Sequence, residues 1–249
     1  MSKLEVGRGA AYLYAETITT MFGGYIFWLV ISKLASTEII GTYATIVSLA
    51  NIVVTVVTFG IPNGIQSFLG KSFAEQKVEN SKVWIKVSLV IVTVGLMISI
   101  IITVILRDLI YEAFKFDLNL LIVLILFMSS TSIYTLFRFV IIATLKTKRL
   151  TIVTVISTII KFAVAVLLAF FGAASFGVAA GVILFPLLLS ILLGLIITTI
   201  LKSSAGKPNF TFGNALKKTF AASVGFWIPS VISIVGSQLG TIIVKGSQG

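Results

Sequence analysis

The chain has 249 residues, of which 58% are hydrophobic and only 11% are charged, and its mean hydropathy is +1.14. Soluble domains carry charges at about a quarter of their positions, so this composition excludes a water-soluble fold and indicates a membrane protein. The sequence contains neither His nor Cys, which excludes disulfides, zinc or haem ligation and catalysis by imidazole or thiol groups. We therefore expect no cofactor, no metal and no enzymatic activity.

Seven charge-poor stretches are each long enough for the roughly 20-residue helix that crosses a bilayer. In chain order they lie at 8–33, 38–71, 87–106 and 118–145, then twice within 149–202 with a turn at 172–177, and finally at 219–244. The predicted fold class is all-α integral membrane with seven transmembrane helices. The expected units are a six-helix lobe at 1–201, a cytoplasmic linker at 202–218 and one further helix at 219–249.

The basic residues, which give the chain a formal net charge of +11, gather in alternate loops. Lys and Arg are enriched in cytoplasmic loops, so this asymmetry predicts a multi-pass protein of the cytoplasmic membrane with its amino terminus in the cytoplasm. The same loops attract anionic lipid. We therefore expect membrane lipids as partners, and no nucleic acid.

Three charged residues, Glu16, Arg138 and Lys161, fall inside the expected helices. A charge at such depth costs several kcal/mol unless it faces protein or water. At 1.5 Å per residue, Glu16 and Arg138 lie about 12 Å and Lys161 about 18 Å from the cytoplasmic helix ends, so all three can meet. Glu16 and Arg138 form either an ion pair that fixes helix packing or part of a binding site. One carboxylate cannot neutralise two bases, so an anionic guest would relieve the remaining positive charge.

Polar residues at helical spacing accompany these charges on several helices. The stripe on 38–71 includes Asn51 and leads to Gln66, and we expect it to line a wet cavity. The alternative is that these Ser, Thr and amide side chains hold neighbouring helices together. The helix at 87–106 and the second helix within 149–202 are almost wholly apolar and are expected to face lipid.

Two prolines lie inside helices that are expected to line the cavity, Pro62 and Pro229. Proline removes a backbone hydrogen bond and bends a helix. We predict hinges at these positions, through which bending could open one side of the cavity and close the other. Static kinks are the alternative.

Residues 31–43, with the sequence ISKLASTEIIGTY, combine a basic residue, a small loop, an acid and Gly-x-Tyr. A helix at 44–60, Ile61 and a basic exit at Lys71 follow. Together with the opening at 9–27, this arrangement resembles the amino-terminal half of polysaccharide and lipid-linked oligosaccharide flippases. These flippases form part of the multidrug/oligosaccharidyl-lipid/polysaccharide exporter superfamily.

The resemblance implies two six-helix lobes around a central cavity, so the chain would be a fragment that holds the first lobe and one helix of the second. It also implies that an anionic polyprenyl-linked oligosaccharide or polysaccharide precursor is flipped by alternating access, with a coupling ion as a further candidate partner. The candidate substrate-binding residues are Arg138, Lys161, Glu16, Asn51 and Gln66. The alternatives are a cation-coupled multidrug exporter that uses Glu16 as its ion site, and a non-transporting membrane scaffold.

Overall fold

The computed structural model describes residues 3–75, 78–202 and 211–247, and these residues form nine helices and no β-strand. The helices are α1 (Lys3–Ile31), α2 (Thr37–Val57), α3 (Ile61–Ala74), α4 (Val78–Ile105), α5 (Arg107–Phe114), α6 (Leu118–Ala143), α7 (Thr147–Phe170), α8 (Ala174–Lys202) and α9 (Phe212–Ser247). The all-α prediction is therefore confirmed for the described part of the chain.

Six of these helices are long and apolar enough to cross a membrane: α2, α4, α6, α7, α8 and α9. α1 has 29 residues, or about 43 Å at 1.5 Å per residue, so its length would also suffice. It is not among the six, and Glu16 and a group of threonines lie in its middle. The predicted count of seven is consequently not confirmed.

The stretch 38–71, predicted as one helix, is divided in two. α2 ends at Val57 and α3 begins at Ile61, and Gly60 between them has a left-handed φ of 66°. Glycine adopts this conformation readily because it has no Cβ. Pro62 therefore lies in the first turn of α3, where a helix does not need the missing N–H, and not inside a kinked helix. The prediction of one continuous helix here is wrong.

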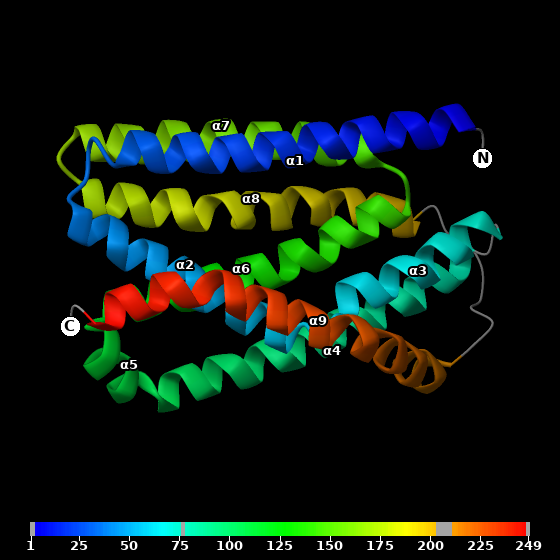
Figure 1. Ribbon diagram of the computed structural model, residues 1–249. Coiled ribbons are helices and arrows are strands. Elements are labelled where there is room, and N and C mark those ends of the chain that lie inside the picture. Colours follow the sequence, from blue (N-terminus) through cyan, green and yellow to red (C-terminus); the bar gives the residue numbers. More distant parts are fainter. Residues whose placement is uncertain (1–2, 76–77, 203–210, 248–249) are drawn as a thin grey trace.

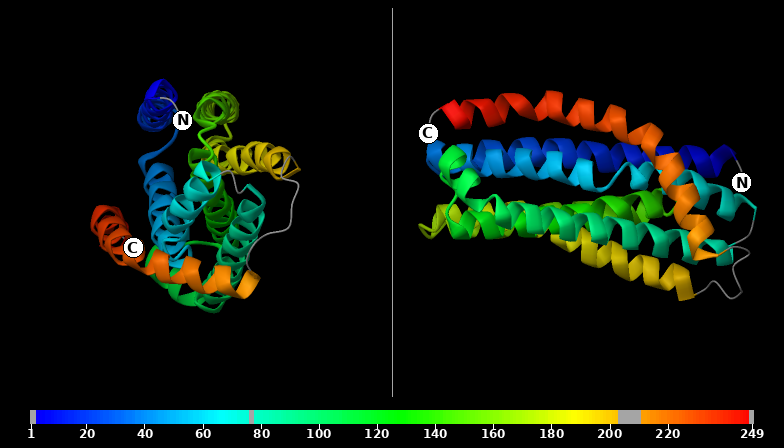
Figure 2. Two further views of the ribbon diagram at one scale, coloured as in Figure 1. Left: turned by 90° about the vertical axis from the view of Figure 1, so that its right-hand side faces the viewer. Right: turned by 90° about the horizontal axis from the view of Figure 1, so that it is seen from below.

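Two other boundaries differ from the predicted ones. The turn between α7 and α8 spans 171–173, so the end of the predicted turn at 172–177 already lies inside α8. Of the predicted linker, residues 203–210 lie outside the described residues, and Phe212 to Lys218 form the first turns of α9. α9 contains Pro229 and is visibly bent (Figure 2).

The helices lie roughly along one direction (Figure 1). α1 and α7 lie side by side at one edge, α8 packs against both α7 and α6, and α2, α3, α4 and α9 complete the other side. The prediction that both of the most apolar helices face lipid is only partly right. α8 lies between α6 and α7 with Leu189 and Leu193 fully buried, although Ile191 and Leu195 remain exposed.

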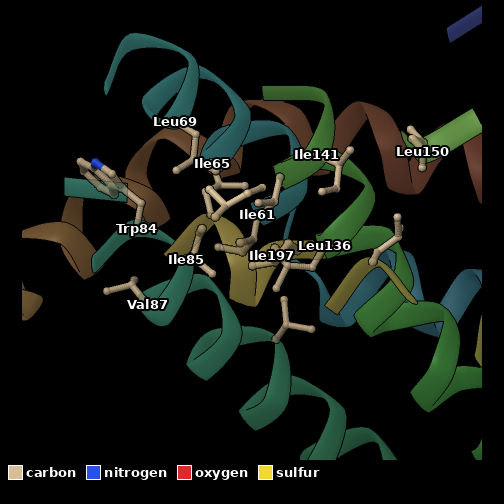
Figure 3. Packing of buried hydrophobic residues seen from close by; sticks show 14 of the residues in the cluster. Ile61, Ile65, Leu69, Trp84, Ile85, Val87, Leu136, Ile141, Leu150 and Ile197 are labelled. Carbon is tan, nitrogen blue, oxygen red and sulfur yellow. The ribbon is translucent and has the colours of Figure 1, made fainter. Parts of the chain in front are cut away.

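Buried apolar side chains form two clusters, one toward each end of the bundle. The first joins α3, the start of α4 and the end of α6 through residues such as Ile65, Ile85 and Leu136 (Figure 3). The second joins the end of α1 to the start of α2 and includes Phe27 and Ile46. Glu16 on α1 and Lys161 on α7 lie between these two clusters along their helices. Arg138 lies within the part of α6 that belongs to the first cluster, between Leu136 and Val140.

The loops that carry most of the basic residues meet at one end of the molecule. The amino terminus, the junction of α3 and α4, the turn between α6 and α7, and the start of α9 all lie there (Figure 1). The fold thus places these loops on one side, as a cytoplasmic face requires. The direction of the chain across a membrane stays a prediction.

Candidate functional site

Glu16 on α1 and Arg138 on α6 form a two-pronged ion pair. Arg138 Nε donates to Glu16 Oε1 at 3.0 Å and Arg138 Nη2 donates to Glu16 Oε2 at 2.8 Å. The exposed fraction is 2% for the Glu16 side chain and 27% for that of Arg138. Parallel bonds of this kind are among the strongest hydrogen bonds in proteins. The ion pair that the sequence left open is therefore present, and it fastens α1 to α6.

The guanidinium of Arg138 is not fully occupied by this pair. The hydrogen bonds to Glu16 use Nε and Nη2, and among the described residues no acceptor bonds to Nη1. Nη1 therefore keeps N–H donors that no described residue uses, and about a quarter of the Arg138 side chain is exposed.

Lys161 on α7 is held by aromatic rings. Its Nζ lies 3.9 Å from the ring centroid of Phe27 on α1 and 5.5 Å from that of Phe185 on α8. Such contacts contribute about 0.5 to 2 kcal/mol, depending on how far the cation is removed from water. Within the described part of the chain, Lys161 makes neither an ion pair nor a hydrogen bond. The ammonium group is thus positioned but not neutralised.

Aromatic side chains link the two bases. Tyr134 lies one turn before Arg138 on α6, and its ring centroid is 6.2 Å from that of Phe185, which also faces Lys161. The prediction that the three charges meet is therefore confirmed for Glu16 and Arg138, whereas Lys161 approaches them only through these rings.

Sequence reasoning missed the two aromatic residues that hold Lys161. Phe27 follows Glu16 by eleven residues, which is about three helical turns, so both lie on the same face of α1. That spacing could have identified Phe27. Nothing in the sequence marks Phe185, because α8 is apolar along nearly its whole length.

A polar cavity of about 200 Å³ lies where α2, α3, α6 and α9 meet. All the residues that line it are uncharged, and Asn51, a predicted site residue, is one of them. The polar members are Asn51, Thr55, Thr58, Asn63, Thr131, Thr135 and Ser230. A cavity thus lies beside the polar stripe of α2, but no described residue of α1 or α7 lines it.

Gln66 does not join this cavity. It lines a separate hollow of about 620 Å³ between α3 and the end of α6, next to Phe73 and Thr144. The break between α2 and α3 separates the two residues, which a continuous helix would have kept on one stripe. Of the five predicted substrate-binding residues, the structure joins only Glu16 and Arg138 directly. Lys161 contacts aromatic rings, and Asn51 and Gln66 line two separate hollows.

The break that shapes the polar cavity is held by α9. Trp227 Nε1 donates to the carbonyl oxygen of Val56 at 3.1 Å, in the last turn of α2. A Cβ atom on Gly60 would lie 2.6 Å from the carbonyl oxygen of Ser223, so only glycine allows this close approach. Pro229 and Ser230 follow on the same helix, and Ser230 reaches the cavity.

The sequence profile of one known family, described as "Polysaccharide biosynthesis protein", matches residues 6–247. No characterised protein and no solved structure matches the chain at a significant level. The match covers nearly the whole chain and agrees with the resemblance seen in residues 31–43 and their surroundings. With its helices long and apolar enough to cross a membrane, the chain is a membrane protein that belongs to the polysaccharide biosynthesis protein family.

Proposed function

We propose that the chain acts in a transporter, and not as an enzyme, that flips an anionic polyprenyl-linked oligosaccharide or polysaccharide precursor across the cytoplasmic membrane. Its membership in the polysaccharide biosynthesis protein family and its six membrane-length helices support this role. The observation that carries the proposal is Lys161. This cation lies inside the bundle, and no carboxylate of the described residues neutralises it.

The phosphate or pyrophosphate of the substrate binds between Lys161 and the unoccupied Nη1 of Arg138. Both donors are charged, and charge-assisted hydrogen bonds to phosphate oxygens are strong. Glu16 holds the guanidinium in place, and Phe27 holds the ammonium. The substrate enters from the cytoplasmic leaflet, and alternating access is driven by movement about Pro62 and Pro229, with a coupling ion as an additional partner.

The exporter alternative has less support. It requires Glu16 to bind a proton or a sodium ion, but both carboxylate oxygens already accept hydrogen bonds from Arg138. The scaffold alternative requires polar residues that are buried against one another, whereas Asn51 and its neighbours line an open space.

The test replaces Lys161 in the full chain by glutamine, which is one bond shorter and still polar but carries no charge. We expect transport of the lipid-linked precursor, measured as surface polysaccharide and as precursor retained in the inner leaflet, to fall about tenfold or more. Lys33→Gln, at an exposed position outside the described helices, is the matched control. Unchanged export by a folded Lys161→Gln protein would refute the assignment of Lys161 to the phosphate.

A further inference from the structure

We propose that the groove between α4 and α9 binds one phospholipid of the bilayer that carries a net negative charge. The phosphate of this lipid lies at Lys217, and one of its acyl chains lies along the groove. None of the described residues that line the groove belongs to the candidate functional site. The inference therefore does not rest on the proposed function.

The walls of the groove are almost wholly apolar. α4 supplies Val90, Val94 and Ile98, which recur every four residues and so share one face of the helix. α9 supplies Leu216 and Phe220, which are also four residues apart. All five side chains are exposed, from 38% for Leu216 to 53% for Ile98. In a membrane such side chains contact hydrocarbon, which is as apolar as they are, so an acyl chain suits these walls.

The dimensions of the groove match a chain that belongs to one leaflet. Its volume is about 690 Å³, within the range of about 300 to 1,000 Å³ that small-molecule sites occupy. Val90 and Ile98 are eight residues apart, which is about 12 Å at 1.5 Å per residue. The hydrocarbon of one leaflet is about 15 Å deep, half the thickness of the whole core. An acyl chain that follows this part of α4 thus stays within its own leaflet.

Basic side chains lie at one end of the apolar walls. Lys217 lines the groove directly. Lys86 is exposed one helical turn before Val90, on the same face of α4 and nearer the basic end of the molecule. Among the described residues neither lysine forms an ion pair, no acid lines the groove, and Glu79, the acid of α4, lies seven residues before Lys86. The end of the groove therefore carries an excess of positive charge, which attracts an anionic headgroup.

A phospholipid matches both the walls and the charge, whereas other occupants match only one of them. A neighbouring transmembrane helix would cover the apolar walls but would leave Lys217 without a counter-charge. Free phosphate would pair with Lys217 but would leave the walls unfilled. Lys217 lies in the second turn of α9, which begins at the basic end beside α4 (Figure 1). A phosphate there accepts charge-assisted hydrogen bonds from the ammonium group, while the chain attached to it follows Val90 to Ile98.

The first experiment measures how tightly the purified full chain binds two phospholipids with identical acyl chains. Delipidated protein in detergent is titrated with phosphatidylglycerol, which is anionic, or phosphatidylcholine, which is not, and the bound lipids are counted by native mass spectrometry. We expect one phosphatidylglycerol per chain to bind about tenfold tighter than phosphatidylcholine, because basic residues at a membrane surface favour anionic lipid. Lys217→Gln lowers this preference about fivefold, whereas Lys148→Gln, at an exposed position in the first turn of α7, changes it by less than about twofold.

The second experiment locates the bound chain. Ala221→Phe adds a ring at the wall of the groove and weakens binding of both phospholipids, and Ala10→Phe at an exposed position of α1 is the matched control. Phosphatidylglycerol with a photoactivatable diazirine in its acyl chain is expected to label residues 90–98 and 216–221 more strongly than the exposed apolar side chains of α1. Even labelling of all exposed apolar faces would refute a defined site.

Three further results would overturn the proposal. Equal binding of phosphatidylcholine would show that the charge of the headgroup plays no part. A loss with Lys148→Gln as large as that with Lys217→Gln would show a diffuse attraction by all basic loops. Displacement of the bound phospholipid by an equal amount of a polyprenyl phosphate would assign the groove to the transported lipid. Lys161→Gln leaves the preference for phosphatidylglycerol unchanged, so failure of the proposed phosphate site and failure of this lipid site are distinguishable.

Discussion

Arg138 and Lys161 are both bases in the middle of the bundle, but the fold accommodates them in opposite ways. Arg138 is matched by a carboxylate with two short hydrogen bonds, whereas Lys161 contacts only the faces of aromatic rings. An ion pair satisfies a charge permanently, whereas an aromatic ring attracts a cation without neutralising it. The comparison teaches that the fold pairs the first base with a carboxylate and so joins two helices, whereas it leaves the second base without a carboxylate among the described residues.

Removing the carboxylate of the pair is expected to have the largest effect. Glu16→Gln leaves Arg138 without its counter-charge, and loss of one partner of a buried ion pair costs about 3 to 5 kcal/mol. Because Arg138 is partly exposed, we expect the free energy of unfolding to fall by an amount near the lower limit, about 3 kcal/mol. The measurement is unfolding in detergent micelles. Asp108→Asn, which breaks a surface pair with Arg107, should change stability by less than about 0.5 kcal/mol. Equal effects of the two changes would contradict a structural role for the pair of Glu16 and Arg138.

The second-largest loss of stability is expected when the Phe27 ring, which contacts Lys161, is crowded. A Cβ on Gly181 of α8 would lie 2.7 Å from the ring of Phe27, which is fully buried. Overpacking of this kind costs about 1 to 3 kcal/mol, so we expect Gly181→Ala to lower stability by about 2 kcal/mol. Gly24→Ala on α1, where nothing lies within 4 Å, should be neutral or stabilising. A neutral Gly181→Ala would show that the Phe27 ring moves freely.

The contact of Lys161 with Phe27 is measurable as a coupling free energy. In a double-mutant cycle of Lys161→Met and Phe27→Leu, we expect about 1 kcal/mol of coupling, because the ring attracts the ammonium in a site with little water. The same cycle with Phe22, which is 61% exposed, should give no coupling beyond about 0.5 kcal/mol. Equal couplings would remove the special role of Phe27.

Lys161→Met alone is expected to have the smallest effect on stability. The change removes the ring contact, but it also removes the cost of keeping an unneutralised charge inside the bundle. We expect the free energy of unfolding, measured by thermal unfolding, to change by less than about 0.5 kcal/mol, whereas transport is lost. If Lys161→Met lowered stability as much as Glu16→Gln does, Lys161 would stabilise the fold in the same way as Arg138, and the difference between the two bases would be refuted.

Much of the site follows from counting charges along the sequence. Equal depths of Glu16 and Arg138 predict that they can pair, and the excess of bases predicts that Lys161 is left without a carboxylate. The all-helical fold follows from composition. The helices, the ion pair and the unpaired lysine depend on the spacing of residues along the chain and on the free-energy cost of a charge in a membrane. Both can be read from the sequence without knowing how the helices pack.

The break at Gly60 could not be predicted in the same way. A continuous apolar stretch with a proline is compatible with a kink or with an ended helix. Contacts of Ser223 and Trp227, more than 160 residues further along the chain, accompany the ended helix. The separation of Gln66 from Asn51 depends on this tertiary contact. Sequence periodicity therefore assigned both residues to one stripe, and the fold divides them.

The hydrogen bond from Trp227 to Val56 ties the seventh long apolar segment to the end of α2. Because the indole of Trp227 on α9 is hydrogen-bonded to the last turn of α2, we expect a tilt of α9 to shift the end of α2 as well. Ser230, three residues after Trp227 on α9, lines the polar cavity and would move with the helix. We therefore expect a tilt of α9 to change the volume of this cavity.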